Sequence, residues 1–337
     1  VGILLPASSA AAIATVAVNL RGKVAVHLNY TAGAVAVHSA IASAGVKSVL
    51  TSRLFITRLA ERGIDVDQLL PAEVERVILE DVREQLPKWK LVTAALLHTA
   101  LPARWFYRLY GRSVDIESPA AILFSSGSES APKGIVLSHR NIMCNSKQIS
   151  DVLNTQVNDV MMSCLPPFHS FGLTVTTLLP LIEGIPMICH PDPTDSLGVA
   201  RAVARYQATL LLGTSTFLSF YARNKKVHPL MLDSLRVVVS GAEKLSDRVR
   251  DEFEHKFRKT IYEGYGATET TPVASVNIPD AMDTTDWKIQ EGNVKGTVGM
   301  PLPGTSFRIV DPETFAELPL GEDGLILISG QQVMLGY

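Results

Sequence analysis

The sequence predicts an α/β fold with two αβαβα subdomains, each built on a parallel sheet, followed by a smaller antiparallel, barrel-like β region. Short apolar runs alternate with helix-like stretches over most of the chain, which favours mainly parallel sheets covered by helices on both faces. After about Pro279, glycines and prolines instead punctuate short β-prone runs. We expect the subdomains at residues 1–154 and 155–278, and the β region at residues 279–337.

The first subdomain opens on a strand-like run at residues 1–5, followed by a turn and an Ala-rich packed helix. Pro6, Ser8 and Asn19 interrupt this uncharged stretch, so we do not expect it to span a membrane. The chain begins within a strand-like run and without Met, so we expect it to be part of a longer protein. Apolar runs predict further strands at 24–28, 48–51, 76–79 and 120–124, with a helix at 34–44.

A second β–α series runs from about Val160 to Tyr265. The predicted strands are 160–163, 186–189, 210–212, 236–239 and 261–265. The predicted helices are 195–206, 214–222 and 246–256. Ser246, which precedes an Arg- and Glu-rich stretch, is the expected N-cap of the last helix.

Composition excludes several classes of protein. With 337 residues, 47% hydrophobic and 19% charged, the chain is long and apolar enough to bury a substantial core. The net charge of −2 provides no basic field for binding nucleic acid. The three cysteines, Cys144, Cys164 and Cys189, lack CxxC spacing and are expected to be buried free thiols.

Two basic stretches allow more than one interpretation. Residues 104–112 are both aromatic and basic, and could contact a membrane surface or an acidic partner. A helix that packs its aromatics and leaves its arginines in water is the favoured interpretation. Residues 223–226 could contact an acidic carrier protein, although a solvated helix end is favoured there.

The stretch from Phe124 to Gly134 has the composition of a polyphosphate-binding loop. Small and hydroxylated residues follow a predicted strand, which lets N–H groups and hydroxyls approach an oxyanion, and Lys133 can neutralise part of its charge. It is not a Walker loop, because Pro132 precedes the lysine and a glycine follows it. An ordinary polar turn between a strand and a helix is the alternative.

Two later stretches carry further candidates. Gly241 and Ala242 follow a predicted strand, where small residues let a flat ring lie against the backbone; a tight turn with Gly at positive φ is the alternative. In residues 261–269, Glu269 stands where a dinucleotide fingerprint would need its third Gly. A carboxylate near a nucleotide usually binds through Mg²⁺, with phosphate oxygens completing the site.

Four segments, at residues 124–134, 166–172, 240–243 and 265–269, resemble in order the motifs of the adenylate-forming enzymes. That superfamily includes acyl-CoA synthetases, luciferases and peptide-synthetase adenylation domains. The resemblance implies that His169 lies between an incoming carboxylate and the α-phosphate of ATP, that Thr268 contacts phosphate, and that Glu269 binds Mg²⁺. The ATP-binding residues it implies, besides Lys133, are Ser125, Ser126, Gly127, Ser128, Gly134, Gly241, Ala242, Glu243, Tyr265 and Gly266.

The expected reaction is attack of a carboxylate oxygen on the α-phosphate, which gives acyl-AMP and pyrophosphate. Apolar and small residues near the expected site suit a fatty acid better than an amino acid. The expected substrate-binding residues, besides His169, are Gly213, Thr214, Ser215, Thr216 and Gly264.

A narrower resemblance covers nearly the whole chain. Segments such as 28–33, 168–175, 213–218 and 242–245 are similar to the acyl–acyl-carrier-protein synthetase domain of bifunctional 2-acylglycerophosphoethanolamine acyltransferases. The similarity implies acyl carrier protein as partner and lysophosphatidylethanolamine as downstream acceptor, through a linked acyltransferase domain. It also implies a location on the cytoplasmic side of the bacterial inner membrane.

The chain departs from the superfamily pattern in two respects. Glu129 lies within the loop and would repel a triphosphate, so we expect it to point away or to pair with a cation. The chain also stops before the ribose-binding Asp and the C-terminal lid domain with its adenylation Lys, so we expect a partial catalytic unit. An acyl-CoA synthetase and a non-catalytic nucleotide-binding fragment are the alternatives.

Overall fold

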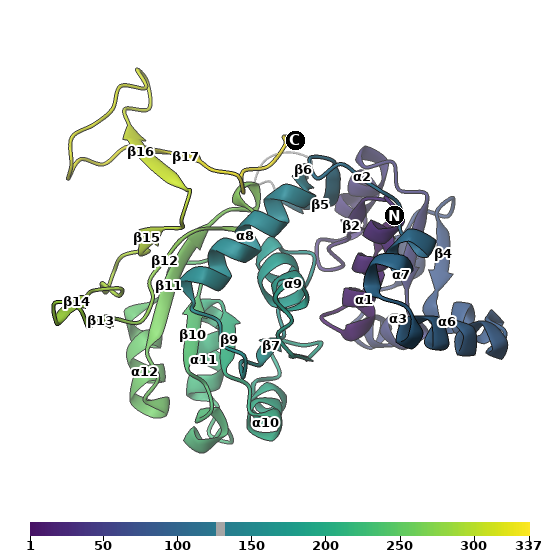
Figure 1. The fold of residues 1–337 in the computed structure, drawn as a ribbon, viewed down its shortest axis with the longest axis horizontal. Helices are drawn as coiled ribbons and strands as arrows, with labels where there is room; N and C mark the ends of the chain where they lie inside the picture. Colours follow the sequence, from purple (N-terminus) through teal and green to yellow (C-terminus); the bar gives the residue numbers. More distant parts are fainter. Residues whose placement is uncertain (126–131) are drawn as a thin grey trace. The chain divides into compact units, whose positions relative to one another are not determined.

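A computed structural model describes residues 1–125 and 132–337 and confirms the predicted α/β class (Figure 1). The described residues form two compact units, each built on its own sheet. Unit 1 comprises residues up to His139, together with residues 166–169 and 335–337. Unit 2 comprises residues 140–165 and 170–334. None of the described helices is both long and apolar enough to cross a lipid bilayer.

The sheet of unit 1 is parallel except at one edge. Its strand order is β4 (Glu75–Ile78), β3 (Ser48–Thr51), β1 (Gly2–Ile3), β2 (Ala25–His27), β5 (Pro119–Ser125) and β6 (Lys133–Ser138). The edge strand β6 pairs antiparallel with β5. On its other side, Val136 exchanges backbone hydrogen bonds with Leu335 and Gly336, so the end of the chain adds to this edge.

Helices of unit 1 follow its strands. They are α1 (Ser9–Leu20), α2 (Ala34–Ser43), α3 (Arg53–Glu61), α4 (Val66–Leu69), α5 (Leu79–Gln85), α6 (Lys88–Ala100) and α7 (Ala103–Tyr110). The expected Ala-rich helix is α1, in which the Ser8 hydroxyl accepts a hydrogen bond from the Ala11 N–H (3.2 Å). Its buried face includes Ala11, Ala14 and Val18, which pack against β1 and β2 residues of the core.

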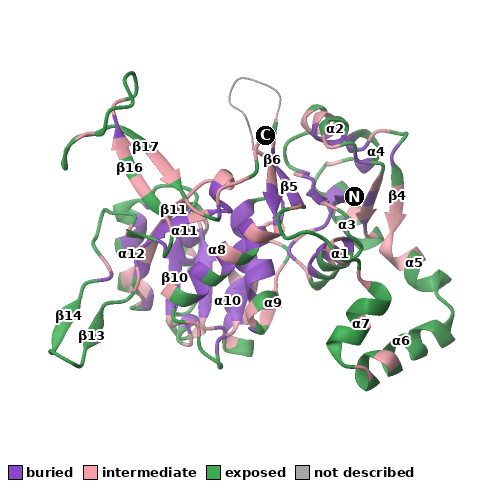
Figure 2. Cartoon of the chain, turned by 45° about the horizontal axis from the view of Figure 1, so that its top comes forward, coloured by how far each residue is buried: buried purple, intermediate pink, exposed green. Residues whose placement is uncertain are grey.

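The sheet of unit 2 holds the second predicted series. Five parallel strands run in the order β8 (Met187–Cys189), β7 (Met161–Ser163), β9 (Leu210–Gly213), β10 (Val237–Ser240) and β11 (Ile261–Gly266). Two antiparallel strands, β12 (Val273–Val276) and β15 (Met300–Pro301), extend it beyond β11. All four residues of both β9 and β10 are buried, as expected for central strands covered on both faces (Figure 2).

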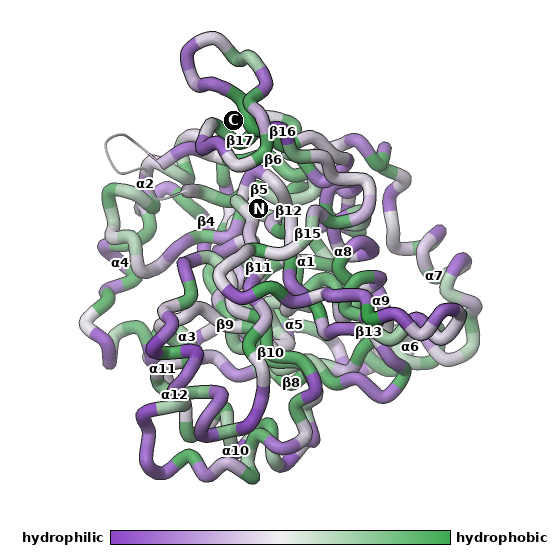
Figure 3. The backbone as a smooth tube through the Cα atoms, turned by 90° about the vertical axis from the view of Figure 1, so that its left-hand side faces the viewer, coloured by the Kyte–Doolittle hydropathy of each residue, from purple (hydrophilic) through white to green (hydrophobic). Residues whose placement is uncertain are grey.

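Helices cover this sheet. They are α8 (His139–Val152), the π-helix η1 (Phe171–Leu178), α9 (Leu179–Glu183), α10 (Ser196–Tyr206), α11 (Ser215–Arg223) and α12 (Asp247–Phe257), with 3₁₀ turns η2 (Pro229–Leu232) and η3 (Thr268–Thr270). The tube of α10 carries both hydrophobic and hydrophilic segments (Figure 3), and the helix buries Val199, Ala200 and Val203. Ser246 is the N-cap of α12 as predicted, but its side chain makes no capping hydrogen bond.

The β-rich region is antiparallel as expected, but it forms separate pieces. Hairpins β13 (Ala281–Asp283)–β14 (Lys288–Gln290) and β16 (Ser306–Val310)–β17 (Leu325–Ser329) are each two-stranded sheets of their own. Among the described residues, therefore, no barrel closes. The two hairpins stay separate and β15 joins the sheet of unit 2, so these short strands form no continuous sheet that could curl into a barrel.

Polar residues on one face of α8 anchor much of the last third of the chain to unit 2. Asn141 donates to the carbonyl oxygens of Gln331 and Val333 (both 2.8 Å), and Gln148 donates to Pro303 (2.7 Å). Asn145, between them on the helix, donates to Val273 O (2.7 Å). Spacings of three and four residues place these side chains on one face, where each donates to a partly buried backbone carbonyl.

A largely buried ion pair ties the start of β10 to the loop before β7. Asp159 has 1% of its side chain exposed and accepts hydrogen bonds from Arg236 Nε (2.7 Å), Arg236 Nη2 (2.5 Å) and the Thr209 hydroxyl (2.7 Å). Burial alone would raise the Asp159 pKa, but these hydrogen bonds and the Arg236 charge outweigh it and lower the pKa.

Acidification is therefore expected to weaken unit 2 through Asp159. Because its folded-state pKa is depressed, the contribution of Asp159 is complete above its unfolded pKa of about 4, and is lost as the pH falls through the folded-state pKa. Asp159→Asn should lower the free energy of unfolding at pH 7 by about 2 kcal/mol, measured by urea denaturation. It should also flatten the acid limb of stability against pH. Equal acid limbs in both proteins would show that the pair contributes nothing.

Candidate functional site

Three neighbouring parallel strands of unit 2 bring most of the predicted residues of that unit to one edge of the sheet. Gly213 at the end of β9 pairs with Ser240 at the end of β10, and Ser240 also pairs with Glu263 in β11. Residues 213–216, 241–243 and 264–269 therefore lie within or just after the carboxyl ends of adjacent strands. Open α/β sheets bind their ligands at this edge.

The turn after β10 differs from the simple glycine turn considered as an alternative. The residue at positive φ is Ala242 (φ 67°), whereas Gly241 is not in the left-handed region. The Gly241 N–H donates to Gly213 O (3.1 Å), and a Cβ at Gly241 would lie 3.4 Å from the Phe171 ring. Glycine thus keeps this backbone close to β9 and to an aromatic face, whereas Ala242 holds a conformation that costs about 1–2 kcal/mol for an L-residue.

Glu243 fastens this turn to the start of α11. Its carboxylate accepts the Thr216 N–H (2.5 Å), and Thr214, the N-cap of α11, accepts the Phe217 N–H (3.3 Å). Partial burial opposes ionisation of Glu243, but hydrogen bonds from Thr216 and Thr214 outweigh it and lower the pKa. The ionised carboxylate positions the turn, and its contact with ATP stays a prediction.

The corner after β11 holds Tyr265, Gly266, Thr268 and Glu269. A Cβ at Gly266 would lie 1.8 Å from the Pro272 carbonyl oxygen, so only glycine fits there. The Ser170 hydroxyl donates to the Thr268 hydroxyl (3.4 Å), and the main-chain oxygen of Glu269 accepts the Met334 N–H (2.8 Å). Glu269 is partly exposed, and the Tyr265 ring meets the Phe307 ring edge-on at 6.4 Å.

In unit 1 the ends of the predicted phosphate loop are paired strands. Ser125 of β5 lies opposite Lys133 of β6, and Phe124 lies opposite Gly134. The loop is therefore followed by a strand and not by a helix. Lys133 is exposed, with its Nζ 5.2 Å from the centroid of the Tyr337 ring. The predicted residues Ser126, Gly127 and Ser128, and the departure at Glu129, lie outside the described residues.

His169 also belongs to unit 1, through its neighbour Phe168. Phe168 is buried in the unit 1 core and meets the Tyr30 ring edge-on at 4.9 Å. The His169 ring lies 4.6 Å from that of Phe168, and the partial desolvation of its imidazole lowers the His169 pKa. His169 is therefore mainly neutral at pH 7 and, although anchored by its neighbour, remains exposed to solvent.

Two residues at the edge of the unit 2 sheet were not predicted. Glu263 in β11 forms an ion pair with the buried Arg250 of α12, and it also accepts the Leu245 N–H (3.3 Å). It thereby braces the segment that follows the Gly241 turn. Ser240, at the end of β10, has a buried hydroxyl that finds no hydrogen-bond partner among the described residues. Both residues lie within the segments singled out in the sequence. A charged residue inside a predicted strand could have indicated Glu263, and a serine directly before Gly241 could have indicated Ser240.

The carboxyl edge of the unit 2 sheet suits a metal ion that takes most of its coordinating oxygens from a bound phosphate and few from the protein. Among the described residues, no three His, Cys, Asp or Glu side chains gather into a metal site. Mg²⁺ commonly uses only one or two protein carboxylates and takes its remaining ligands from phosphates and water. A partly exposed Glu269 at the carboxyl edge of a parallel sheet fits that requirement.

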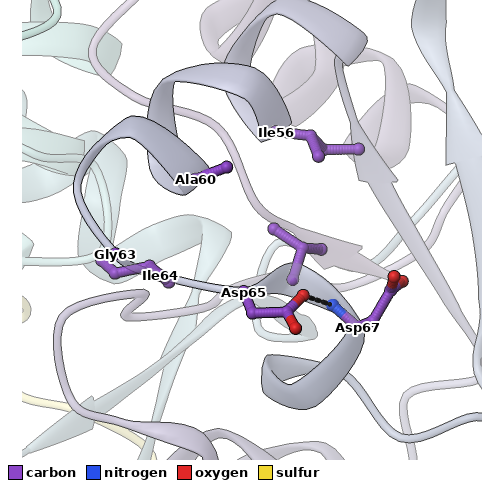
Figure 4. Close-up of a pocket in the computed structure, with 7 residues that line it drawn as sticks. Ile56, Ala60, Gly63, Ile64, Asp65 and Asp67 are labelled. Carbon is purple, nitrogen blue, oxygen red and sulfur yellow. Dashed lines mark hydrogen bonds between the residues drawn. The ribbon is translucent and has the colours of Figure 1, made fainter.

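A pocket of about 270 Å³ lies elsewhere in unit 1, between the end of α3 and α4 (Figure 4). Ile56, Ala60 and Ile64 give it an apolar wall. Its two carboxylates have structural partners: Asp65 accepts the Asp67 N–H (2.9 Å), and Asp67 pairs with Arg76. None of the predicted site residues that the structure describes lines it, and we assign it no part in the site.

Comparison with known proteins finds CoA ligases among those to which this chain is similar. It is 27% identical over 297 residues to the long-chain-fatty-acid–CoA ligase of Salmonella typhimurium (strain LT2), which covers 87% of the chain and 50% of that enzyme. It is 31% identical over 285 residues to the probable 4-coumarate–CoA ligase 1 of Dictyostelium discoideum, covering 81% of the chain and 49% of that protein. The chain thus spans about half the length of these curated relatives.

Solved structures give the same result. The crystal structure of ATP-bound MatB from Rhodopseudomonas palustris superposes with a TM-score of 0.76 at 26% identity, covering 100% of this chain and 61% of that chain. A family profile described as "AMP-binding enzyme" matches residues 1–337. This chain therefore belongs to the AMP-binding enzyme family.

Proposed function

We propose that the protein carrying this chain uses ATP and Mg²⁺ to activate a fatty acid as acyl-AMP, and then passes the acyl group to the phosphopantetheine thiol of acyl carrier protein. The observation that supports this most is the carboxyl edge of the unit 2 sheet, where Gly241, Thr268 and Glu269 follow neighbouring parallel strands of an AMP-binding family member. A fatty-acid–CoA ligase and an ATP-bound enzyme are among its relatives.

Each predicted residue has a proposed role toward ATP. Gly241 and Ala242 leave the backbone open to the adenine ring, and Tyr265 stacks on it. The 125–128 loop, Lys133, Gly134 and Thr268 bind phosphate oxygens. Glu269 would hold Mg²⁺, which supplies positive charge to the phosphate oxygens when bound.

The proposed chemistry is an in-line displacement. One oxygen of the fatty acid carboxylate forms a bond to the α-phosphorus as the bond to the pyrophosphate oxygen breaks. The thiolate of phosphopantetheine then attacks the acyl carbonyl carbon, and AMP leaves with the electron pair of the broken bond. A fatty acid is already ionised at pH 7, so no general base is needed, and His169 would orient the carboxylate as a neutral imidazole.

The small residues 213–216 and Gly264 are the proposed neighbours of the acyl chain. Their backbone lies at the end of β9 and inside β11, and Ser215 is buried, with its hydroxyl accepting the Ser246 N–H (3.2 Å). Residues 213–216 contain no acidic side chain, and the neighbouring Glu243 carboxylate already accepts the Thr216 N–H, so it is engaged in holding the turn. This supports a fatty acid over an amino acid as the substrate.

The acceptor thiol is the finer part of the proposal. Acyl carrier protein, with lysophosphatidylethanolamine as the eventual acceptor at the cytoplasmic face of the inner membrane, follows from the narrower sequence resemblance. Coenzyme A is the second candidate, because the relatives include CoA ligases. Product formation with holo-carrier protein and with coenzyme A, each at equal concentration, distinguishes the two acceptors.

The enzyme proposal itself is tested by fatty-acid-dependent ATP–pyrophosphate exchange in the protein that carries this chain. Exchange that requires a fatty acid supports adenylation whichever thiol is used. Nucleotide binding without exchange would instead favour a non-catalytic nucleotide-binding protein, the third candidate, which the acidic Glu129 suggests.

Lys133→Ala is expected to slow this exchange about tenfold, because a charge-assisted contact of about 1.5 kcal/mol to a phosphate would be lost. Lys133 is exposed at the end of an edge strand, so the thermal midpoint should stay unchanged. Lys147→Ala on α8 is the matched control, since Lys147 is also exposed and forms an ion pair with Asp151 of the same helix (2.9 Å). Exchange kinetics equal to wild type would exclude the proposed role of Lys133.

A further inference from the structure

Helices α6 and α7 form a surface that the proposed ligase activity does not use. We call residues 88–110 the helical hairpin. Neither helix contains a buried residue, in contrast to α1 or α2 of the same unit (Figure 2). Helices of 13 and 8 residues are marginal in water without an apolar face packed on something else.

The exposed apolar residues of α6 form a stripe. Trp89, Val92 and Leu96 are 65%, 58% and 62% exposed, and spacings of three and four residues put them on one face. Thr93 lies on the same face, and its hydroxyl donates back to Trp89 O (2.7 Å). That hydroxyl therefore does not depend on water for its hydrogen bond.

In α7 the aromatic residues divide between two roles. Phe106 packs between His98 of α6 (ring centroids 5.9 Å apart) and Tyr110 (4.7 Å), which holds the two helices together. Trp105 and Leu109, four residues apart, remain 48% and 60% exposed. The expectation that this helix packs its aromatics is thus correct for Phe106 and wrong for Trp105.

The charge of this segment has one sign. Residues 86–114 contain five basic side chains and no Asp or Glu, although the whole chain has a net charge of −2. The five are Lys88, Lys90, Arg104, Arg108 and Arg112. Lys90 lies over the Trp89 ring (5.6 Å) and Arg108 over the Trp105 ring (5.4 Å), so the cations border the exposed aromatics.

We propose that the helical hairpin docks on an anionic lipid surface, with Trp89, Leu96, Trp105 and Leu109 in the acyl–headgroup boundary and the basic side chains on lipid phosphates. Interfacial helices combine Trp and Leu on one face with Lys and Arg beside it, and each cation near an anionic surface adds to binding. The hairpin is attached to unit 1 through its C-terminal end, where Arg112 N–H donates to Leu20 O (2.8 Å) and Arg21 donates to Tyr110 O (2.9 Å).

An acidic protein is the other occupant that five cations would attract, but the exposed side chains favour lipid. Recognition of a partner by charge alone would not require two tryptophans and several aliphatic side chains to be exposed on adjacent helices. Trp and aliphatic residues with snorkelling lysines and arginines match the polarity profile of a bilayer interface. The inference does not depend on adenylation, and either can fail alone.

Intrinsic fluorescence of the purified 337-residue chain provides the test. Its three tryptophans are Trp89, Trp105 and Trp287, so Trp287→Phe leaves reporters only in the hairpin. With this variant, vesicles of phosphatidylcholine and phosphatidylglycerol (7:3) should shift the emission to the blue and should co-sediment the protein. Phosphatidylcholine alone, or 0.5 M NaCl, should weaken binding at least tenfold.

Two double variants separate the apolar and charge contributions. Trp89→Ser with Leu96→Ser, and Arg104→Gln with Arg108→Gln, should each weaken binding to the mixed vesicles at least tenfold, with unchanged circular dichroism because no buried residue is altered. Lys225→Gln with Lys226→Gln is the matched control on another basic stretch and should bind like wild type.

Three results would overturn the proposal. One is the absence of binding to the mixed vesicles, and another is equal binding by the hairpin variants and the control. The third is a protein that does not bind the vesicles but binds polyglutamate, with binding weakened by 0.5 M NaCl. That result would identify an acidic protein as the occupant. Because neither ATP nor fatty acid is present, each result leaves the exchange assay as an independent test of the ligase.

Discussion

Glu269→Gln is expected to slow fatty-acid-dependent ATP–pyrophosphate exchange on the order of 10²-fold, the largest functional effect among the proposed site residues. The substitution keeps the size of the side chain but removes the charge proposed to hold Mg²⁺. The main-chain oxygen of Glu269, which accepts the Met334 N–H (2.8 Å), would be untouched, so the fold should persist. Exchange should recover partly as Mg²⁺ is raised, because the lost contact lowers the affinity of a shared ion.

The measurement is exchange rate against Mg²⁺ concentration, with thermal midpoint as the check on folding. Glu291→Gln, on an exposed residue just after β14, is the matched control and should leave both quantities unchanged. A Glu269→Gln protein with the wild-type Mg²⁺ requirement would refute its role as a metal ligand. A Glu269→Gln protein that fails to exchange and also has a lowered thermal midpoint would say nothing about the chemistry. Glu269→Asp therefore supplies a second test, because it retains the charge. Its exchange rate should rise more steeply with Mg²⁺ concentration than that of the Gln variant.

Gly266→Ala is expected to cause the largest loss of stability. The new Cβ would lie 1.8 Å from the Pro272 carbonyl oxygen and 3.1 Å from the Val273 Cα, and both are backbone atoms that cannot rotate away. The corner between β11 and β12 would have to open, breaking the Ala267 N–H bond to Pro272 O (3.1 Å). We expect the free energy of unfolding to fall by about 4 kcal/mol.

Urea denaturation of the wild-type and variant chains measures this loss. Gly296→Ala is a contrasting control, because Gly296, unlike Gly266, has a positive φ (79°) and no described atom lies within 4 Å of the added Cβ. That control isolates backbone strain, which should cost about 1 kcal/mol. If the two variants lose the same stability, the contact with Pro272 does not explain the need for glycine at position 266.

The central strands were predictable because they are continuous apolar runs. Leu210–Gly213 extends the predicted strand 210–212 by one residue, and Val237–Ser240 is shifted by one residue from the predicted 236–239. A strand buried on both faces is apolar throughout and needs no alternation. The same reasoning located the carboxyl ends where Gly213 and Gly241 lie. The sequence did not show which strands pair with one another. The pairing of β9 with β10 is what brings Gly213 and Gly241 together.

Features that depend on contacts distant in the sequence escaped prediction. Strand β6 owes its place to β5 and to residues 335–336, and the segment that carries His169 belongs to unit 1 because Phe168 fills a gap beside Tyr30. The Glu263–Arg250 pair joins a strand to a helix 13 residues away. The sequence placed the possible positive φ of this turn at Gly241, because glycine adopts it most readily, whereas the structure has it at Ala242.

The hydrogen bonds between Val136 and residues 335–336 have a consequence for solubility. Without them, β6 would present unpaired N–H and C=O groups along an apolar run, Ile135–Val136–Leu137, to any other extended chain. The backbone of residues 335–336 pairs with this edge strand and thereby opposes self-association, whatever it contributes to catalysis. A change that breaks the pairing of Val136 with residues 335–336 would leave this edge of the unit 1 sheet open to other chains.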